Sequence, residues 1–330
     1  MKSPPARFTG KSPATGLVSD SDQAGRLRVH QDQGHRSARH RRGFQRLILA
    51  ASAVVGFGLA WPRLGPALAT PVAGGASLHV LAVADTGSGN KHQRAVGQQM
   101  ALVNRRQPVD LVVLAGDNVY PDGDPAKLEQ AFVKPYQELL ANKVPFFAVL
   151  GNHDIRTRNG EGQVAYPAFG MGGRWYSLRR GPVEFFLLDT NVNAAWQHQL
   201  PWLKAALARS TSPWKVVVGH HPLYTAGFYG DDPAGIARLT PLFKRYGVQL
   251  YINGHDHNYE RTKRLHGTTY LTVGGGGANL RAVLPNEHTA YATSQYSFAQ
   301  LNFGAKKLRI EGWNAEGQRI DQAVLSLGGD

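Results

Sequence analysis

Five apolar runs of strand length each end in a short loop that carries Asp, Asn or His, and this repetition constrains the fold more than any other feature. The run 110–115 leads into Gly116-Asp117-Asn118-Val119-Tyr120. The other four runs lead into a second set of polar residues: Asp85, Asn152, His153, His220, His255 and His257. Buried parallel strands have continuous apolar sequences, and open α/β sheets place their sites at the carboxyl ends of strands. Donors repeated at strand ends therefore predict a metal cluster.

Strand and helix patterns alternate along the chain with the spacing of βαβ units, which predicts an α/β fold. Strands are expected at 78–84, 110–115, 145–150, 175–178, 183–188, 214–218, 248–252, 270–273, 297–303, 307–313 and 323–327. Helices are expected at 91–104, 126–141, 199–208 and 236–246. Pro135 should kink the second helix. We expect a long loop at 155–174 and a tight turn at 274–277, and we find no internal repeat or second-domain boundary.

The amino-terminal segment differs in composition from the rest of the chain. Residues 1–69 hold 11 Lys and Arg against 3 Asp and Glu, a net charge of +8, which is more than half of the formal charge of +14. Residues 1–38 are rich in Pro, Ser, Gly, Gln and Arg and lack an apolar period, which predicts disorder. Residues 39–69 combine a basic region, an uncharged apolar stretch and a small-residue cleavage signal, which predicts a signal peptide. The domain itself is then expected at 70–330.

The basic pair Arg41-Arg42, with Phe44 two places on, resembles a twin-arginine export signal. His40 and Gln45 depart from that pattern. The apolar stretch 47–60 is shorter than the roughly 20 residues that a spanning helix needs. We therefore expect export to the periplasm or the extracellular space, with an uncleaved membrane anchor as the alternative.

Composition limits the chemistry of the remaining 261 residues, 70–330. This body is moderately basic, which favours anionic substrates such as phosphate esters. No cluster of Lys and Arg in it alternates with aromatic residues, so no nucleic-acid partner is indicated. The sequence has no cysteine, which excludes disulfides, thiolate zinc sites and cysteine nucleophiles. Any metal must be bound by His, Asp, Asn or Tyr, which suits iron, zinc or manganese.

Asp117 lies between the two sets of donors and is the natural bridging carboxylate. Two metal ions about 3.5–4 Å apart can share such a group and contact both sides of an in-line phosphoryl displacement. A bound cation lowers the pKa of water, so a metal-bound hydroxide can attack phosphorus. The sequence contains no Gly-x-Ser-x-Gly motif, and no protein nucleophile is needed.

Five ordered motifs resemble the metallophosphoesterase (calcineurin-like) superfamily over roughly residues 77–325. They are Asp85-Thr86-Gly87, Gly116–Tyr120, Gly151–Asp154, Gly219-His220 and Gly254–His257. Tyr120, three residues after Asp117, is typical of the purple acid phosphatase branch. Gln199–Leu203 and Asn253–Asn258 resemble the tartrate-resistant, low-molecular-weight type. The resemblance implies a four-layer αββα sandwich, in which two mixed β-sheets are flanked by helices and a binuclear site lies at the strand ends.

The resemblance also implies how the two metal ions are bound. Fe(III) would be held by Asp85, Asp117, Tyr120 and His257. The second ion, a divalent Fe, Zn or Mn, would be held by Asp117, Asn152, His220 and His255. The division is chemically consistent, because hard anionic ligands favour a trivalent ion while imidazoles and an amide suit a divalent one.

The resemblance gives His153 the role of binding substrate and protonating the leaving oxygen. Asp154 could orient His153, or it could be an ordinary turn cap. His221 either faces the substrate or is a packed loop residue. In the mammalian-type enzymes another His follows the ligand His by about nine residues, and here 228–230 read Phe-Tyr-Gly.

The sequence thus predicts an exported phosphomonoesterase that acts on small phosphorylated substrates, with a membrane involved only in export. A phosphodiesterase or nucleotide pyrophosphate hydrolase of the same superfamily is one alternative. A non-catalytic surface protein that binds metal or phosphate is another, although complete ligand sets argue against it. Substrate choice should depend on the loops at 155–174 and 224–235, and the oligomeric state is left open.

Overall fold

A computed structural model describes residues 77–328 of the chain. The predicted segments 1–38 and 39–69 lie outside the described residues, so the export signal stays a prediction. Among the described residues, no helix is both long enough and apolar enough to cross a membrane.

The described residues form two β-sheets. The six-stranded sheet contains β1 (Leu78–Val83), β2 (Leu111–Leu114), β3 (Phe146–Ala148), β11 (Ser297–Phe303), β12 (Lys307–Asn314) and β13 (Arg319–Ser326). The seven-stranded sheet contains β4 (Tyr176–Arg180), β5 (Val183–Leu187), β6 (Trp214–Val218), β7 (Leu250–Asn253), β8 (Tyr259–Thr262), β9 (Thr269–Val273) and β10 (Thr289–Thr293). The longer helices are α1 (Lys91–Arg106), α4 (Trp196–Arg209) and α5 (Pro233–Tyr246), and the shorter ones are α2 (Gln137–Ala141) and α3 (Glu161–Val164).

Both sheets mix parallel and antiparallel pairs. The first has the order β13-β12-β11-β1-β2-β3, in which β1, β2 and β3 are parallel and β11, β12 and β13 continue antiparallel from β1. The second has the order β10-β8-β9-β7-β6-β5-β4, with a parallel centre from β5 to β9. The parallel strands β1, β2, β3, β6 and β7 bring their carboxyl ends together, and this arrangement creates the site.

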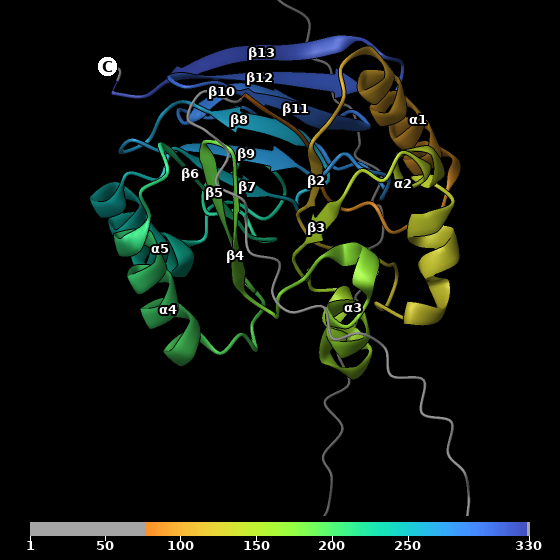
Figure 1. Cartoon of the computed structure of the whole chain (residues 1–330), viewed down its shortest axis with the longest axis horizontal. Coiled ribbons are helices and arrows are strands. Elements are labelled where there is room, and N and C mark those ends of the chain that lie inside the picture. Colours follow the sequence, from red (N-terminus) through yellow and green to blue (C-terminus); the bar gives the residue numbers. More distant parts are fainter. Residues whose placement is uncertain (1–76, 329–330) are drawn as a thin grey trace, which may run out of the picture. The chain divides into compact units, whose positions relative to one another are not determined.

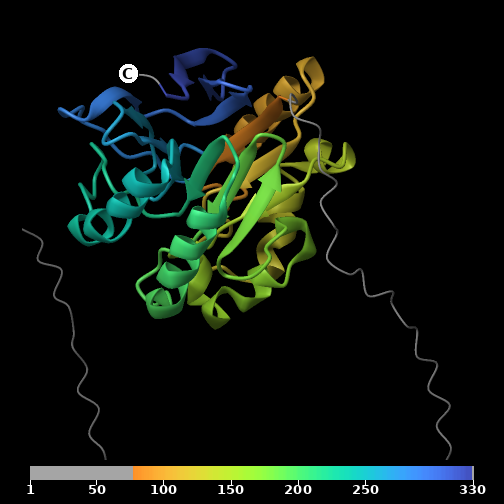
Figure 2. The same cartoon turned by 60° about the vertical axis from the view of Figure 1, so that its left-hand side comes forward.

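Alternating side chains divide the apolar core into three parts, as the period-2 geometry of strands requires. Val80 of β1 and Phe185 of β5 lie in the core between the sheets. Leu81 points the other way and packs with Met100 of α1, while Phe186 packs with α4 and α5. Figures 1 and 2 show α1 and α2 on one side of the sheets and α4 and α5 on the other. The predicted four-layer αββα sandwich is therefore confirmed.

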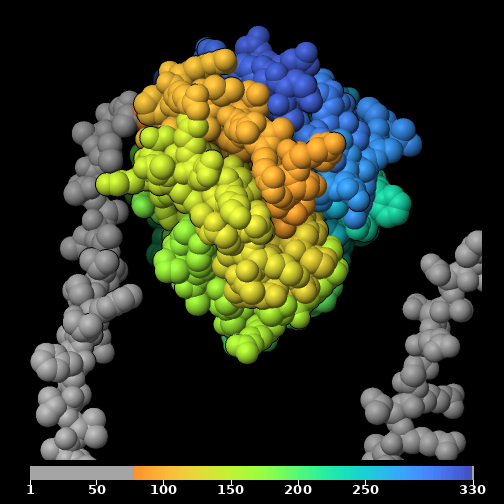
Figure 3. All heavy atoms as spheres, turned by 90° about the vertical axis from the view of Figure 1, so that its right-hand side faces the viewer, coloured from red at the N-terminus to blue at the C-terminus, as the bar shows by residue number. Residues whose placement is uncertain are grey.

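The predicted helix at 126–141 is wrong as a continuous element. It consists of a 3-10 turn (Pro125–Lys127), a π-helical turn (Glu129–Val133) and α2. Pro135, which cannot donate a backbone hydrogen bond, lies in the break. This segment packs closely on α1, where a Cβ on Gly97 would lie 2.3 Å from the carbonyl oxygen of Pro135. Figure 3 shows the face that α1 and this segment cover, coloured orange to yellow.

Two further expectations need correction. The segment 155–174 is not a structureless loop, because it contains α3 and 3-10 turns at Arg158–Gly160 and Pro167–Phe169. The run 274–277 is a buried bend rather than a tight turn. Its glycines are required by close packing, since a Cβ on Gly274 would lie 2.0 Å from the carbonyl oxygen of Asp256.

The sequence pattern missed β8 and β10. Polar residues fill β8, whose sequence is Tyr-Glu-Arg-Thr, so neither an apolar run nor a regular alternation marks it. Long-range partners stabilise these buried polar groups: Arg261 donates to Asp321 on β13 at 2.7 and 2.9 Å, and Glu260 accepts from Ala226 N at 2.8 Å. Those partners are distant in sequence and therefore invisible to local patterns.

Candidate metal centre

The loops after β1, β2, β3, β6 and β7 bring all the predicted donors to one place. Three of the donor residues, Asp85, Asp117 and His255, have φ angles of 56°, 53° and 69°. Left-handed backbone is uncommon for residues other than glycine and concentrates at functional sites. Backbone hydrogen bonds link the loops to each other, from Asp85 N to Gly116 O at 3.0 Å and from Gly254 N to His220 O at 2.9 Å. The donors are therefore held in place by the fold.

The first group of donors surrounds the hydroxyl of Tyr120. This hydroxyl lies 2.9 Å from Asp117 Oδ2, 3.1 Å from Asp85 Oδ1 and 3.3 Å from His257 Nε2. His257 Nδ1 lies 2.7 Å from the carbonyl oxygen of Asn279, which fixes the ring with Nε2 facing the group. The four residues that the resemblance assigned to Fe(III) thus converge on one point.

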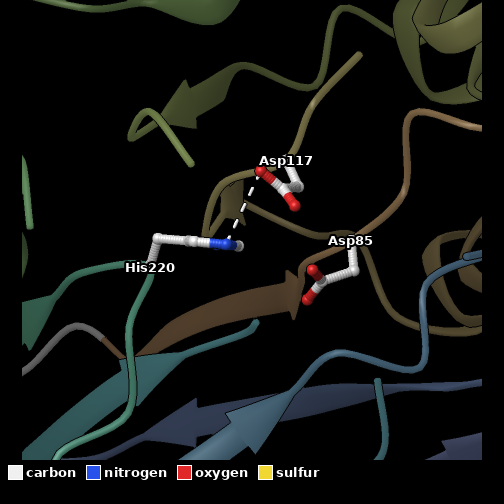
Figure 4. A group of neighbouring side chains, drawn as sticks. All are labelled: Asp85, Asp117 and His220. Atoms are coloured by element: carbon white, nitrogen blue, oxygen red, sulfur yellow. Dashed lines mark ion pairs between the residues drawn. The ribbon is translucent and has the colours of Figure 1, made fainter. Parts of the chain in front are cut away.

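The second group surrounds the side-chain oxygen of Asn152. Asn152 Oδ1 lies 3.1 Å from His220 Nε2 and 2.9 Å from His255 Nδ1. His220 Nε2 is also 3.5 Å from Asp117 Oδ1. Asp117 therefore presents one carboxylate oxygen to each group, as a bridging ligand must. Figure 4 shows Asp85, Asp117 and His220 pointing toward one another. One ligand atom from each of the three lies within 4.8 Å of the others.

Hydrogen bonding around His220 shows that the residues fit a cation. Burial lowers the pKa of His220 well below its ordinary value, so the ring is neutral. Its Nδ1 lies 2.9 Å from the carbonyl oxygen of Ala115 and carries the proton. Nε2 then presents a lone pair to the oxygens of Asn152 and Asp117. Acceptors that face acceptors in a buried site are unfavourable unless a cation lies between them.

The other donors have similarly perturbed protonation. Burial lowers the pKa of His255 to about 2, which keeps this imidazole neutral. Burial raises the pKa of Asp85 to about 6, and the nearby Asp117 carboxylate adds to the rise. Burial and the same two carboxylates raise the pKa of Tyr120 well above its ordinary value. Two adjacent buried carboxylates and a protonated phenol need positive charge to ionise together, which metal ions supply.

His153 borders the first group of donors at the surface. Its Nδ1 lies 2.6 Å from the carbonyl oxygen of Pro121, and its Nε2 lies 3.9 Å from Asp117 Oδ2. Its ring contacts the ring of Tyr120 edge-on at 4.5 Å. Arg156, which the sequence analysis missed, places a guanidinium nitrogen 3.3 Å from His153 Nε2. The only sequence signal for Arg156 is its position three residues after His153, one 3-10 turn away.

The Asp154 carboxylate lies among donors from the loops of the site. Its buried carboxylate accepts from the backbone N–H groups of Asn118, Val119 and Gly151 at 2.8–3.1 Å. It also accepts from the side-chain amides of Asn118 and Gln163. Burial and Asp117 raise the pKa of Asp154 to about 7, and these donors oppose the rise. Asp154 therefore joins the Asp117 loop to the Asn152 loop instead of orienting the His153 side chain.

His221 lies behind the second group of donors. Its ring centroid is 4.6 Å from that of His255, and its Nδ1 is 2.9 Å from Thr190 Oγ1. Tyr229, in the segment that replaces the expected His, stacks on His255 with centroids 4.0 Å apart. The guanidinium of Arg281 lies 4.7 Å from the centroid of the Tyr229 ring. No local motif singles out Tyr229 or Arg281, so the sequence analysis gave neither a role.

Comparison with known proteins identifies the class. The family model described as Calcineurin-like phosphoesterase matches residues 78–259, over half of the chain. This range contains every donor described above. The chain belongs to the calcineurin-like phosphoesterase family.

Within this family, the chain is similar to purple acid phosphatases. It is 31% identical to purple acid phosphatase 7 of Arabidopsis thaliana, in a match that covers 76% of this chain and 86% of the relative. It is 26% identical to tartrate-resistant acid phosphatase type 5 of Rattus norvegicus, in a match that covers 79% of this chain and 94% of the relative. These comparisons confirm the predicted family and a metal-dependent phosphoester hydrolase.

The solved structure of a purple acid phosphatase from yellow lupin (Lupinus luteus) seeds has the same fold. It superposes with a TM-score of 0.67 at 21% sequence identity, over 76% of this chain and 54% of the lupin chain. The chain is thus a purple acid phosphatase-like metallophosphoesterase with a binuclear type of site.

Proposed function

We propose that the chain is an exported phosphomonoesterase whose site binds Fe(III) together with a divalent Fe, Zn or Mn ion. The observation that carries the proposal is the Asp117 carboxylate, which lies 2.9 Å from the Tyr120 hydroxyl through Oδ2 and 3.5 Å from His220 Nε2 through Oδ1. Asp85, Tyr120 and His257 would complete the trivalent site. Asn152, His220 and His255 would complete the divalent site.

When bound, the metal pair supplies Lewis acidity that lowers the pKa of water and neutralises the charge of the phosphate. The chain supplies positioning and proton transfer. Nδ1 of His153 contacts the Pro121 carbonyl, so Nε2 is the atom that would carry a proton for the leaving oxygen; the Arg156 guanidinium, which donates to Nε2 here, would then have to turn toward the phosphate. Arg156 lies beside His153, and Arg281 lines the same cleft as His153, Tyr120 and His257. Arg281 at this cleft and Arg156 beside His153 favour a phosphate dianion.

A dianionic monoester uses these cations better than a singly charged diester, which is why we place the monoesterase ahead of the phosphodiesterase.

Export is supported only by the leader sequence. Replacing Arg41 and Arg42 together by Lys should leave unprocessed protein inside the cell, whereas the unaltered leader should deliver processed protein beyond the inner membrane. Processed export of the Lys pair would refute the twin-arginine route.

The experiment that tests the proposal is a visible absorption spectrum of the purified protein, with metal analysis on the same sample. A phenolate-to-Fe(III) charge-transfer band is expected, and Tyr120→Phe should lose it. Tyr166→Phe is a matched control, because Tyr166 packs on Phe132 and Phe169 away from the donors. A colourless protein that holds only zinc or manganese would refute the iron assignment. Faster turnover of bis(nitrophenyl) phosphate than of nitrophenyl phosphate would refute the monoesterase.

A further inference from the structure

A cavity of about 420 Å³ adjoins the metal centre on the side of His221 and His255. Trp196, Tyr229 and Leu223 contribute apolar walls, and Val192 lies at its edge. It is separate from the polar cleft that His153, Tyr120 and Arg281 line. Because His255 belongs to both the cavity wall and the donor set, a molecule held at the metals can extend directly into the cavity.

Exposed apolar side chains gather at this cavity. Among residues 77–328, five large hydrophobic side chains are exposed, and Val192, Phe228 and Tyr229 are 99%, 73% and 47% exposed. Val192 and Tyr229 line the cavity, and the Phe228 ring contacts that of Tyr229 at 5.2 Å. Three of the five therefore lie at one entrance, beside a candidate active site. Apolar patches rimmed by polar residues mark ligand-binding grooves.

The aromatic walls are held in fixed positions. Tyr229 contacts the ring of His255, with centroids 4.0 Å apart, and the guanidinium of Arg281 lies 4.7 Å from the Tyr229 centroid. The backbone that leads to Tyr229 is anchored, because Phe228 N donates to Asp256 Oδ1 at 2.9 Å. Trp196 is also contacted by a cation, since the guanidinium of Arg238 lies 4.5 Å from its ring centroid. A flat ligand thus meets prepositioned aromatic surfaces, which reduces the entropy cost of binding.

The charges around the cavity limit what it accepts. Asp231 and Asp232 both line it, and Arg238 is the cation among its lining residues. The carboxylates accept from backbone N–H groups, Asp231 from Thr225 and Asp232 from Ala234. A second phosphate or carboxylate would meet net negative charge here. This argues for an uncharged group and against a nucleotide pyrophosphate.

We propose that this cavity is a subsite for an uncharged aromatic ring in the alcohol portion of the substrate, with Trp196 and Tyr229 as its walls. The inference rests on the proposed phosphomonoesterase, because the phosphate must be held at the metal centre. It names the substrate class as phosphate monoesters of alcohols that carry a flat apolar ring.

The test compares 2-naphthylmethyl phosphate with glycerol 3-phosphate. Both are esters of primary alcohols, so the comparison reports recognition of the ring more than leaving-group reactivity. We expect the metal-loaded enzyme to favour the naphthylmethyl ester in kcat/KM. Trp196→Leu and Val192→Asp should each reduce that preference by about fivefold to tenfold. Val192→Asp changes a fully exposed side chain, so a folding failure cannot explain its effect.

Val324→Asp is the matched control, since Val324 is an exposed residue of β13 that does not line the cavity. It should leave both rates unchanged. An unchanged preference in both Trp196→Leu and Val192→Asp would overturn the subsite. An equal loss of preference in Val324→Asp would overturn it too.

Binding of 2-naphthylmethylphosphonate separates the subsite from the proposed function, because its P–C bond is not hydrolysed. By calorimetry it should bind the metal-loaded protein about tenfold more tightly than methylphosphonate, and Val192→Asp should remove most of this difference. A protein that shows this difference but hydrolyses neither ester retains the subsite and refutes the phosphomonoesterase. A protein that hydrolyses both esters but shows no difference refutes the subsite alone.

Discussion

Replacing Asp154 by Asn tests whether this residue joins two metal-binding loops. Its carboxylate accepts from groups on either side of the site: Asn118 and Val119 follow the bridging Asp117, while Gly151 precedes Asn152. The substitution keeps the size and shape of the side chain and converts one acceptor oxygen to an NH₂ donor. Whichever oxygen becomes the NH₂ group, at least two N–H groups that donated to that oxygen then face the new NH₂ donor.

The magnitude follows from counting the groups left without an acceptor. Leaving a buried donor unsatisfied costs about 1–3 kcal/mol. Two such donors predict a loss of about 2–6 kcal/mol in the free energy of unfolding of Asp154→Asn. Glu138→Gln is the control, because Glu138 pairs with Arg105 at the surface, and its unfolding midpoint should match that of the unaltered protein.

Urea unfolding, metal analysis and kcat/KM should be measured on the same samples. We expect a lower midpoint together with a tenfold to hundredfold weaker metal affinity, since groups that orient ligands have effects of about this size. Wild-type stability combined with an altered acidic limb of the rate profile would refute the reasoning. That result would restore the role of Asp154 as the residue that orients His153.

Three other perturbations follow from the structure. Gly151→Ala should lose bound metal, because the added Cβ would lie 2.2 Å from Asp117 Oδ1, whereas Gly304→Ala, with its nearest contact at 3.4 Å, should keep it; equal metal content in both would contradict this. Removing the metals with a chelator should lower stability by about 4 kcal/mol at a thousandfold excess over Kd, reversibly on adding metal back; an unchanged melting temperature would show that the fold does not depend on the ions. Burial and Asp321 raise the pKa of Tyr259 well above its ordinary value, so above pH 10 the unfolded state alone loses this proton and stability falls. Between pH 10 and pH 11, Tyr259→Phe should therefore lose about 1 kcal/mol less stability than the unaltered protein, measured by urea unfolding, and an equal loss in both proteins would refute it.

The donors could be predicted from the sequence because each is local to a strand end. Asp85, Asp117 and His220 directly follow apolar runs, and parallel strands bring such ends together. The role of Asp154 could not be predicted, because its partners are backbone N–H groups that no side-chain pattern reveals. Tyr229 was missed for a similar reason: its stacking on His255 depends on how separate loops meet.

Alternating strand and helix patterns predicted the α/β class and a kink at Pro135, and the resemblance implied the four layers, whereas β8 was not predicted. In β8 the buried polar groups are satisfied by residues far away in the chain, so the strand lacks an apolar signature. The export signal and the identity of the metals remain predictions, because neither depends on the packing of residues 77–328.

The strand order has a consequence for the time at which the site can form. The central strand β1, which leads to Asp85, pairs on one side with β2 and on the other with β11, near the carboxyl end of the described chain. The donors themselves extend from Asp85 to His257. Such non-local pairings fold slowly. During synthesis, an amino-terminal fragment that stops before His220 holds four of the seven ligand residues and lacks every imidazole ligand, so metal uptake has to follow the folding of both sheets.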